Sequence, residues 1–139
     1  MALTDPEQAD VSLRVPADGA YVSVLRTMTA GLAARLDFTV DDIEDLRIAV
    51  GEACAVVLPE AAPGGDLSAD FRLEPGLLTV SVSVPTEDPR APDYDSFAWQ
   101  VLSTLTLAAN ATTDTDRFQV VFSVESSIPA THGSVGADG

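Results

Sequence analysis

One stretch of the sequence, Asp41 to Leu58, constrains the fold more than any other. Apolar residues recur in it at spacings of three and four, the period at which one face of an α-helix meets a core. These residues are Ile43, Leu46, Val50, Ala53 and Val57. Thr39 is suited to cap the helix start, and acidic residues follow in the first turns, where negative charge favours the helix dipole. The pattern predicts an amphipathic helix that ends before Pro59.

The other periodic segments divide into strands and helices around this helix. Alternating apolar residues predict strands over 11–15, 67–73, 78–84 and 118–124, and helical spacing predicts helices over 20–36 and 96–109. The order β-α-α-β-β-α-β predicts an α+β fold, a two-layer sandwich of a four-stranded mixed sheet with three helices on one face.

The chain has 139 residues, which suits one domain. We expect residues 10–125 to form that domain, residues 1–9 to be a flexible N-terminus, and the polar residues 126–139 to be a disordered tail. The N-terminus has no basic and apolar regions of a signal peptide. No apolar run approaches the roughly 20 residues of a membrane helix. With a single cysteine as well, the sequence predicts a cytoplasmic protein.

Charge narrows the range of partners. The formal net charge is -15, from 22 acidic residues and seven arginines, and the chain has no lysine. Such a surface repels phosphate backbones and anionic lipids, so we expect neither nucleic acid nor a membrane surface as a partner. A protein with a basic patch fits better, although acidity alone also keeps a small protein soluble.

Metal-binding and nucleophilic groups are sparse. The single histidine, His132, lies in the tail, and Cys54 has no second thiol or imidazole nearby in the sequence, so we expect no metal site. Cys54 lies beside the apolar stripe of its helix, which indicates a small buried hydrophobe. The acidic pair Asp93 and Asp95 lacks a calcium-binding loop around it and indicates a solvated segment.

Glu52 stands out on the 41–58 helix because Ile48 and Val56, four residues before and after it, are apolar. A glutamate with such neighbours is a candidate for the partly buried edge of a site. The alternative is an ordinary surface glutamate beside the core stripe, which the spacing alone favours.

The residues Asp-Leu-Arg-Ile-Ala-Val-Gly-Glu-Ala-Cys at positions 45–54 resemble the first nucleotide-binding helix of the RsbW-type anti-sigma factors. These are serine-protein kinases of the GHKL (histidine kinase and Hsp90-like) ATPase superfamily. Val24 to Arg26 resembles the opening helix of that family, and Ser96 to Leu105 resembles its late helix. The resemblance covers roughly residues 10–125 and implies the GHKL fold.

The resemblance implies that Glu52 is the general base that activates a hydroxyl for attack on ATP. The other nucleotide-site positions depart from the family pattern. Val56 stands where the family has a magnesium-binding asparagine, and Asp88 is the nearest candidate for the carboxylate that reads adenine. Ser96 and Ala98 stand at the two glycines that cradle phosphate.

These departures predict that ATP and magnesium binding are weak or absent, so we expect no cofactor and little or no kinase activity. Valine offers no oxygen ligand to Mg²⁺, and backbone N–H groups close on phosphates most readily at glycine. We also expect Phe97 and Trp99 to crowd the phosphate pocket, and the acidic loop from Pro85 to Asp95 to repel a triphosphate.

The function implied by the resemblance is sequestration of an alternative RNA polymerase sigma factor. Release would follow from partner switching with a STAS-domain anti-anti-sigma protein. Arg26 matches the family arginine that contacts both partners, and its alternative is an ordinary surface arginine. The family also often forms a homodimer. Two other interpretations stay open: an active serine-protein kinase that phosphorylates the STAS antagonist, and a non-enzymatic interaction domain on the same fold.

Overall fold

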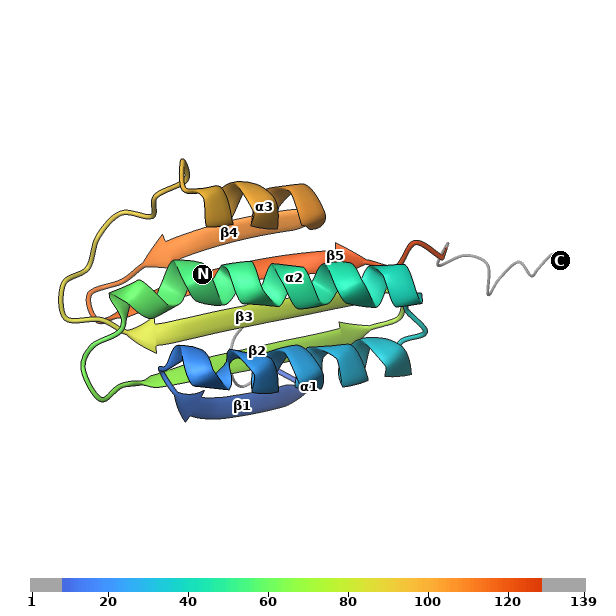
Figure 1. Cartoon of the computed structure of the whole chain (residues 1–139), viewed down its shortest axis with the longest axis horizontal. Coiled ribbons are helices and arrows are strands. Elements are labelled where there is room, and N and C mark those ends of the chain that lie inside the picture. The colour runs from blue at the N-terminus through green and yellow to red at the C-terminus, as the bar shows by residue number, and fades with distance from the viewer. Residues whose placement is uncertain (1–8, 129–139) are drawn as a thin grey trace, which may run out of the picture.

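The computed structural model describes residues 9–128 and contains a five-stranded sheet with three helices over one of its faces (Figure 1). The strands are β1 (Val11–Pro16), β2 (Asp66–Glu74), β3 (Leu77–Pro85), β4 (Ala108–Thr113) and β5 (Arg117–Glu125). The helices are α1 (Val22–Arg35), α2 (Val40–Val57) and α3 (Phe97–Leu105), with short 3-10 turns at Gly19–Tyr21 and Leu58–Glu60. None of the helices within 9–128 is long and apolar enough to cross a membrane.

The sheet has the strand order β1-β2-β3-β5-β4, and every neighbouring pair is antiparallel. The predicted α+β class with three helices over the sheet is confirmed. The prediction of a four-stranded mixed sheet is wrong, because the sheet has a fifth strand and no parallel pair.

The unpredicted strand is β4, and it also explains the strand directions. The sequence predicts a last helix that reaches Ala109, but α3 ends at Leu105 and the chain returns as β4. All side chains of β4 are small or polar, so β4 is defined by its pairing with β5, from Ala108 opposite Ser123 to Thr113 opposite Phe118. A helix alone between β3 and β5 would return the chain parallel. Because α3 and β4 both intervene, β5 runs antiparallel to β3.

The core lies between α2 and the sheet face beneath it (Figure 1). Thr39 and Asp42 form a capping box at the start of α2: Oγ1 of Thr39 accepts from the Asp42 N–H at 3.1 Å, and Oδ2 of Asp42 accepts from the Thr39 N–H at 3.2 Å. The stripe of α2 then buries a set of apolar residues, namely Leu46, Ala49, Val50, Ala53, Cys54 and Val57. Alternate residues of β2, β3 and β5 meet this stripe, including Phe71, Val80, Val82, Val120 and Phe122.

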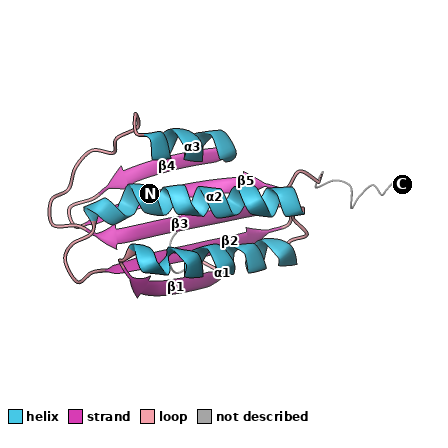
Figure 2. Cartoon of the chain, in the orientation of Figure 1, coloured by secondary structure: helices cyan, strands magenta, loops and turns pink. Residues whose placement is uncertain are grey.

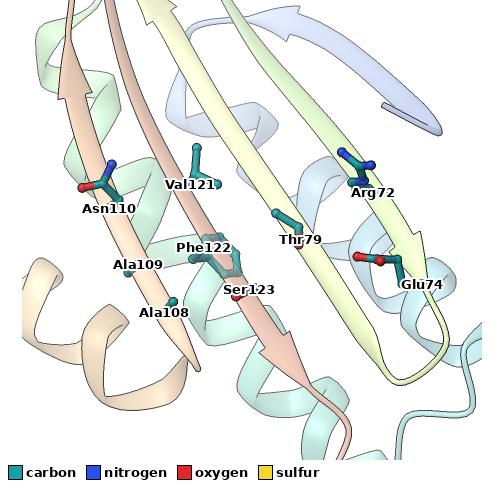
Figure 3. Close-up of a pocket in the computed structure, with 9 residues that line it drawn as sticks. All are labelled: Arg72, Glu74, Thr79, Ala108, Ala109, Asn110, Val121, Phe122 and Ser123. Atoms are coloured by element: carbon teal, nitrogen blue, oxygen red, sulfur yellow. The ribbon is translucent and has the colours of Figure 1, made fainter. Parts of the chain in front are cut away.

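The opposite face of the sheet carries no helix among the residues that the structure describes (Figure 2). Small side chains line it, and Ser81 and Val121 there are only 2% and 4% exposed. A shallow cavity of about 340 Å³ lies on this face (Figure 3). Arg72 of β2 lies on one side of the cavity and Asn110 of β4 on the other. We call this surface the open sheet face.

The chain ends are described only in part. Residues 1–8 of the predicted flexible N-terminus and 129–139 of the predicted tail lie outside the described residues. Just after β5, the backbone N–H and Oγ of Ser127 donate to Oδ2 of Asp42 at 3.0 and 2.9 Å. The start of the tail is thereby joined to the N-terminus of α2.

Candidate functional site

The first candidate site is a surface hollow of about 310 Å³ between α1 and α2, which we call the Arg26 hollow. It is lined by Arg26 of α1 and by four residues of α2, Glu44, Arg47, Ile48 and Glu52. Ile48 is 46% exposed, which is unusual for an isoleucine. Two of the seven arginines of an acidic chain therefore lie beside two carboxylates and an exposed apolar side chain.

Arg26 is seated against the backbone of α2 at Gly51. A Cβ atom added at Gly51 would meet three atoms first, all in the Arg26 guanidinium group: Nη2, and Cζ and Nε at 3.1 Å each. Arg26 also acts electrostatically on Cys54, one turn further along α2. Burial raises the pKa of Cys54 to about 12, and the positive charge of Arg26 opposes that rise. The guanidinium group therefore lies over the 51–54 turn of the helix.

Glu52 is half-buried and lines the Arg26 hollow together with Ile48. Among residues 9–128, neither Arg26 nor Glu52 has a salt bridge. The sequence linked Glu52 to both of its apolar neighbours, but the structure divides them. Ile48 lies in the Arg26 hollow, whereas Val56, one turn later, lines a second hollow.

The second hollow has a volume of about 320 Å³, and we call it the α3 hollow. It brings together three of the positions that the resemblance assigns to a nucleotide site: Val56, Ser96 and Ala98. Asp88 lies in an adjoining hollow of about 160 Å³ that shares Pro59, Glu60 and Arg90 with it. Glu52 lines neither of these two hollows.

The side chains of the α3 hollow offer few groups for a nucleotide. Val56 has no oxygen, and the Ser96 hydroxyl accepts the Trp99 N–H at 3.2 Å as the N-cap of α3. Glu60 and Asp93 add negative charge to the lining. Arg90 is the cation of this hollow, and it pairs with the Asp88 carboxylate at 3.1 Å. Val56 supplies no oxygen ligand for Mg²⁺, and the carboxylates of Glu60 and Asp93 repel a phosphate that approaches without a metal ion.

The expectation that Phe97 and Trp99 crowd this pocket is wrong, because neither side chain lines it. The cap at Ser96 starts α3 at Phe97, whose side chain is 77% exposed. Trp99, two residues on, is 9% exposed and packs edge-on against Tyr94 with ring centroids 5.0 Å apart. The helix start thus directs one ring to solvent and the other to the core.

Two hydrogen bonds join the acidic loop after β3 to strand β4. The Tyr94 hydroxyl donates to the Ala111 carbonyl at 3.2 Å, and the Thr113 hydroxyl donates to the Arg90 carbonyl at 2.6 Å. The loop that borders the α3 hollow is therefore fastened along the edge strand of the sheet.

Sequence reasoning did not single out Glu44, Arg47 and Gly51 as site residues. The four-residue spacing of Glu44, Ile48 and Glu52 was a signal for a shared helix face. A glycine in the middle of a helix was a second signal, since it costs about 1 kcal/mol relative to alanine. As the sequence predicts, Cys54 is buried in the core, at 1% exposed.

Comparison with known proteins identifies relatives named as serine-protein kinases, and no family model matches the chain. A protein named Serine-protein kinase RsbW from Halalkalibacterium halodurans is 37% identical over 98 residues, which are 70% of this chain and 57% of that protein. Proteins of the same name from Bacillus cereus and Bacillus anthracis are 35% identical over 75 residues, or 52% of this chain and 47% of theirs. The chain spans about half the length of these relatives. Their matches, together with the α+β architecture around α2, show that this chain belongs to the RsbW-type family.

Proposed function

We propose that this chain is an anti-sigma factor that sequesters an alternative RNA polymerase sigma factor. In this proposal a STAS-domain anti-anti-sigma protein competes for the same surface and releases the sigma factor. Support comes from the kinship with RsbW proteins and from the net charge of -15. Sigma factors carry basic DNA-binding surfaces, to which an acidic partner is complementary.

The observation that carries the proposal is the Arg26 hollow. It presents a guanidinium group without a salt bridge within 9–128, a second arginine and an exposed isoleucine side by side. Arginine beside an apolar anchor is a frequent composition of the energetic centre of a protein interface. The guanidinium group suits a partner carboxylate, and Ile48 suits an apolar side chain next to it.

We propose further that the chain binds its partner without ATP. Val56 has no oxygen, Ser96 is used as a helix cap, and Glu60 and Asp93 place negative charge at the α3 hollow. We expect a calorimetric titration with ATP and Mg²⁺ to give no binding at micromolar concentrations. A dissociation constant in the low micromolar range would contradict this part of the proposal.

A homodimer through the open sheet face is a further part of the proposal. Most side chains of that face between Arg72 and Asn110 are small, so a second sheet can approach to the usual distance of about 10 Å. Arg72 and Glu74 lie at one side of its cavity, and opposite charges so close together suit a two-fold contact in which each surface meets its own copy.

The second candidate is an active serine-protein kinase. One observation favours it: Glu52 is present, half-buried and without a salt bridge to any residue of 9–128, and it lies one helical turn before Val56, which lines a hollow of about 320 Å³. This candidate predicts ATP-dependent phosphate transfer to the STAS protein, lost in Glu52→Gln. Absence of transfer in the unaltered protein contradicts the kinase and agrees with the first proposal.

Affinity capture from an extract of the source cells, followed by mass spectrometry, tests the main proposal. We expect a sigma factor and a STAS-domain protein among the captured chains. Arg26→Ala should lower capture of both about tenfold or more. Arg35→Ala, an exposed arginine at the other end of α1, is the matched control and should leave capture unchanged. Capture of other proteins in their place would favour the plain interaction domain.

A further inference from the structure

Two glycines lie within the α-helices of residues 9–128, and they differ in their surroundings. Gly31 of α1 has nothing within 4 Å of the place where a Cβ would stand. Gly51 of α2 has the Arg26 guanidinium group there instead. Neither glycine has a positive φ angle. The backbone of α2 therefore does not require glycine at position 51, and the reason for it lies in the space that Arg26 occupies.

The Arg26 side chain holds its place without an ion pair. No salt bridge joins it to another described residue, although Glu44 and Glu52 line the same hollow. The guanidinium group instead lies against α2 at Gly51, within electrostatic reach of Cys54. No salt bridge to a carboxylate within 9–128 engages its N–H donors, which suit a carboxylate of a partner.

We propose that Gly51 is a positioning residue that holds Arg26 in the orientation used for docking a partner carboxylate. Any larger residue at position 51 displaces the guanidinium group from its place against α2. An arginine that is ordered before binding loses less side-chain entropy on binding, so the seat raises affinity. This inference rests on the proposed function for the identity of the partner, but the seat itself belongs to the free protein.

The first experiment is made on the free protein and needs no partner. The seven arginines give separate Nε–H signals in a ¹⁵N-labelled sample, and Arg26→Lys assigns the one of interest. We expect this signal to be ordered on the nanosecond timescale in the unaltered protein and in Gly31→Ala. In Gly51→Ala it should become mobile. An equally ordered Arg26 signal in Gly51→Ala would overturn the proposal.

A set of stability measurements separates the contact between Gly51 and Arg26, which we call the Arg26 seat, from the general effect of alanine on helix stability. Gly31→Ala should raise Tm by about 4 °C, because alanine favours a helix and the site is open. Gly51→Ala should raise Tm much less, or lower it, because the gain is offset by the displaced arginine. In an Arg26→Ala background, Gly51→Ala should stabilise as much as Gly31→Ala does. An increase in Tm from Gly51→Ala that is the same with and without Arg26 would contradict the proposal that Gly51 makes room for Arg26.

A binding cycle then tests the docking role with the sigma factor captured by the unaltered protein. We expect Gly51→Ala to weaken binding about three- to tenfold, and to add no further loss to Arg26→Ala. Unchanged affinity in Gly51→Ala with a mobile Arg26 would overturn the docking role and leave the proposed function intact. If no sigma factor binds the unaltered protein, the proposed function fails, while the order and stability measurements still decide whether Gly51 seats Arg26.

Discussion

The hydroxyl of Ser96 accepts a hydrogen bond from the backbone N–H of Trp99 at 3.2 Å and caps α3. Ser96 stands at a position that the resemblance assigns to phosphate binding, but its hydroxyl serves as the hydrogen-bond acceptor for a backbone N–H at the start of α3. One consequence is for stability. Ser96→Ala should lower the free energy of unfolding by about 1 kcal/mol, measured by urea denaturation. Ser103→Ala, on an exposed position of the same helix, should change it by less than about 0.5 kcal/mol and is the control. Equal effects of the two changes would show that the cap contributes nothing.

The second prediction concerns Asp42 and pH. Burial alone would raise the pKa of Asp42, but hydrogen bonds from Ser127 and Thr39 outweigh it and the pKa is lowered from its usual value of 3.8. A lowered folded-state pKa contributes stability that is present above 3.8 and is lost as the pH falls through the folded-state value. Asp42→Asn should therefore destabilise the protein at pH 7 by about 1 kcal/mol.

Asp42→Asn should also lose less stability than the unaltered protein when the pH is lowered from neutral to acidic. Urea denaturation at each pH measures this loss. Asp45→Asn is the control, because Asp45 is exposed and lies beyond the capping turn. An Asp42→Asn protein whose stability falls with pH as steeply as that of the control would contradict the role of these hydrogen bonds.

The third prediction concerns the loop that borders the α3 hollow. Tyr94→Phe removes the hydrogen bond to Ala111 but keeps the ring contact with Trp99, and should cost about 1 kcal/mol. Tyr94→Ala removes both and should cost about 1 kcal/mol more. Hydrogen exchange should then rise along β4 in both variants. Protection of β4 that stays unchanged in Tyr94→Ala would show that the loop does not hold this edge.

The fourth prediction concerns self-association. Light scattering after gel filtration should give the mass of a dimer for the unaltered protein. Asn110→Arg places a long charged side chain at the cavity of the open sheet face and should give a monomer. Ser103→Arg, on the helical side of the molecule, should leave the dimer intact. A dimer that survives Asn110→Arg and dissociates with Ser103→Arg would assign the contact to the helices.

Much of this fold is predictable from the sequence because large apolar residues alternate or recur with a clear period. The apolar stripe of α2 and the hairpin of β2 and β3 follow such periods. The start of α2 follows a different local signal, the capping residue Thr39. Strand β4 does not, because Ala108 and Ala109 favour a helix and nothing local opposes them. Its strand conformation comes from pairing with β5, from Ala108 opposite Ser123 to Thr113 opposite Phe118, and not from a periodic pattern within β4 itself.

The candidate site is likewise predictable from the sequence only in part. The position of Glu52 on a face with Ile48 follows from helical spacing, and both line the Arg26 hollow. The contact between Arg26 and Gly51 joins two helices, so no pattern within either helix predicts it. Phe97 is exposed for a local reason, the cap at Ser96, whose effect on side-chain direction depends on where the helix starts.

The most direct test of the central claim is a calorimetric titration of this protein with the sigma factor that it captures, with and without Mg²⁺ and ATP. We predict the same dissociation constant in both conditions, and a loss of about tenfold or more in Arg26→Ala. Binding that requires the nucleotide, or that is equally tight in Arg26→Ala, would contradict an anti-sigma factor that holds its partner through the Arg26 hollow without ATP.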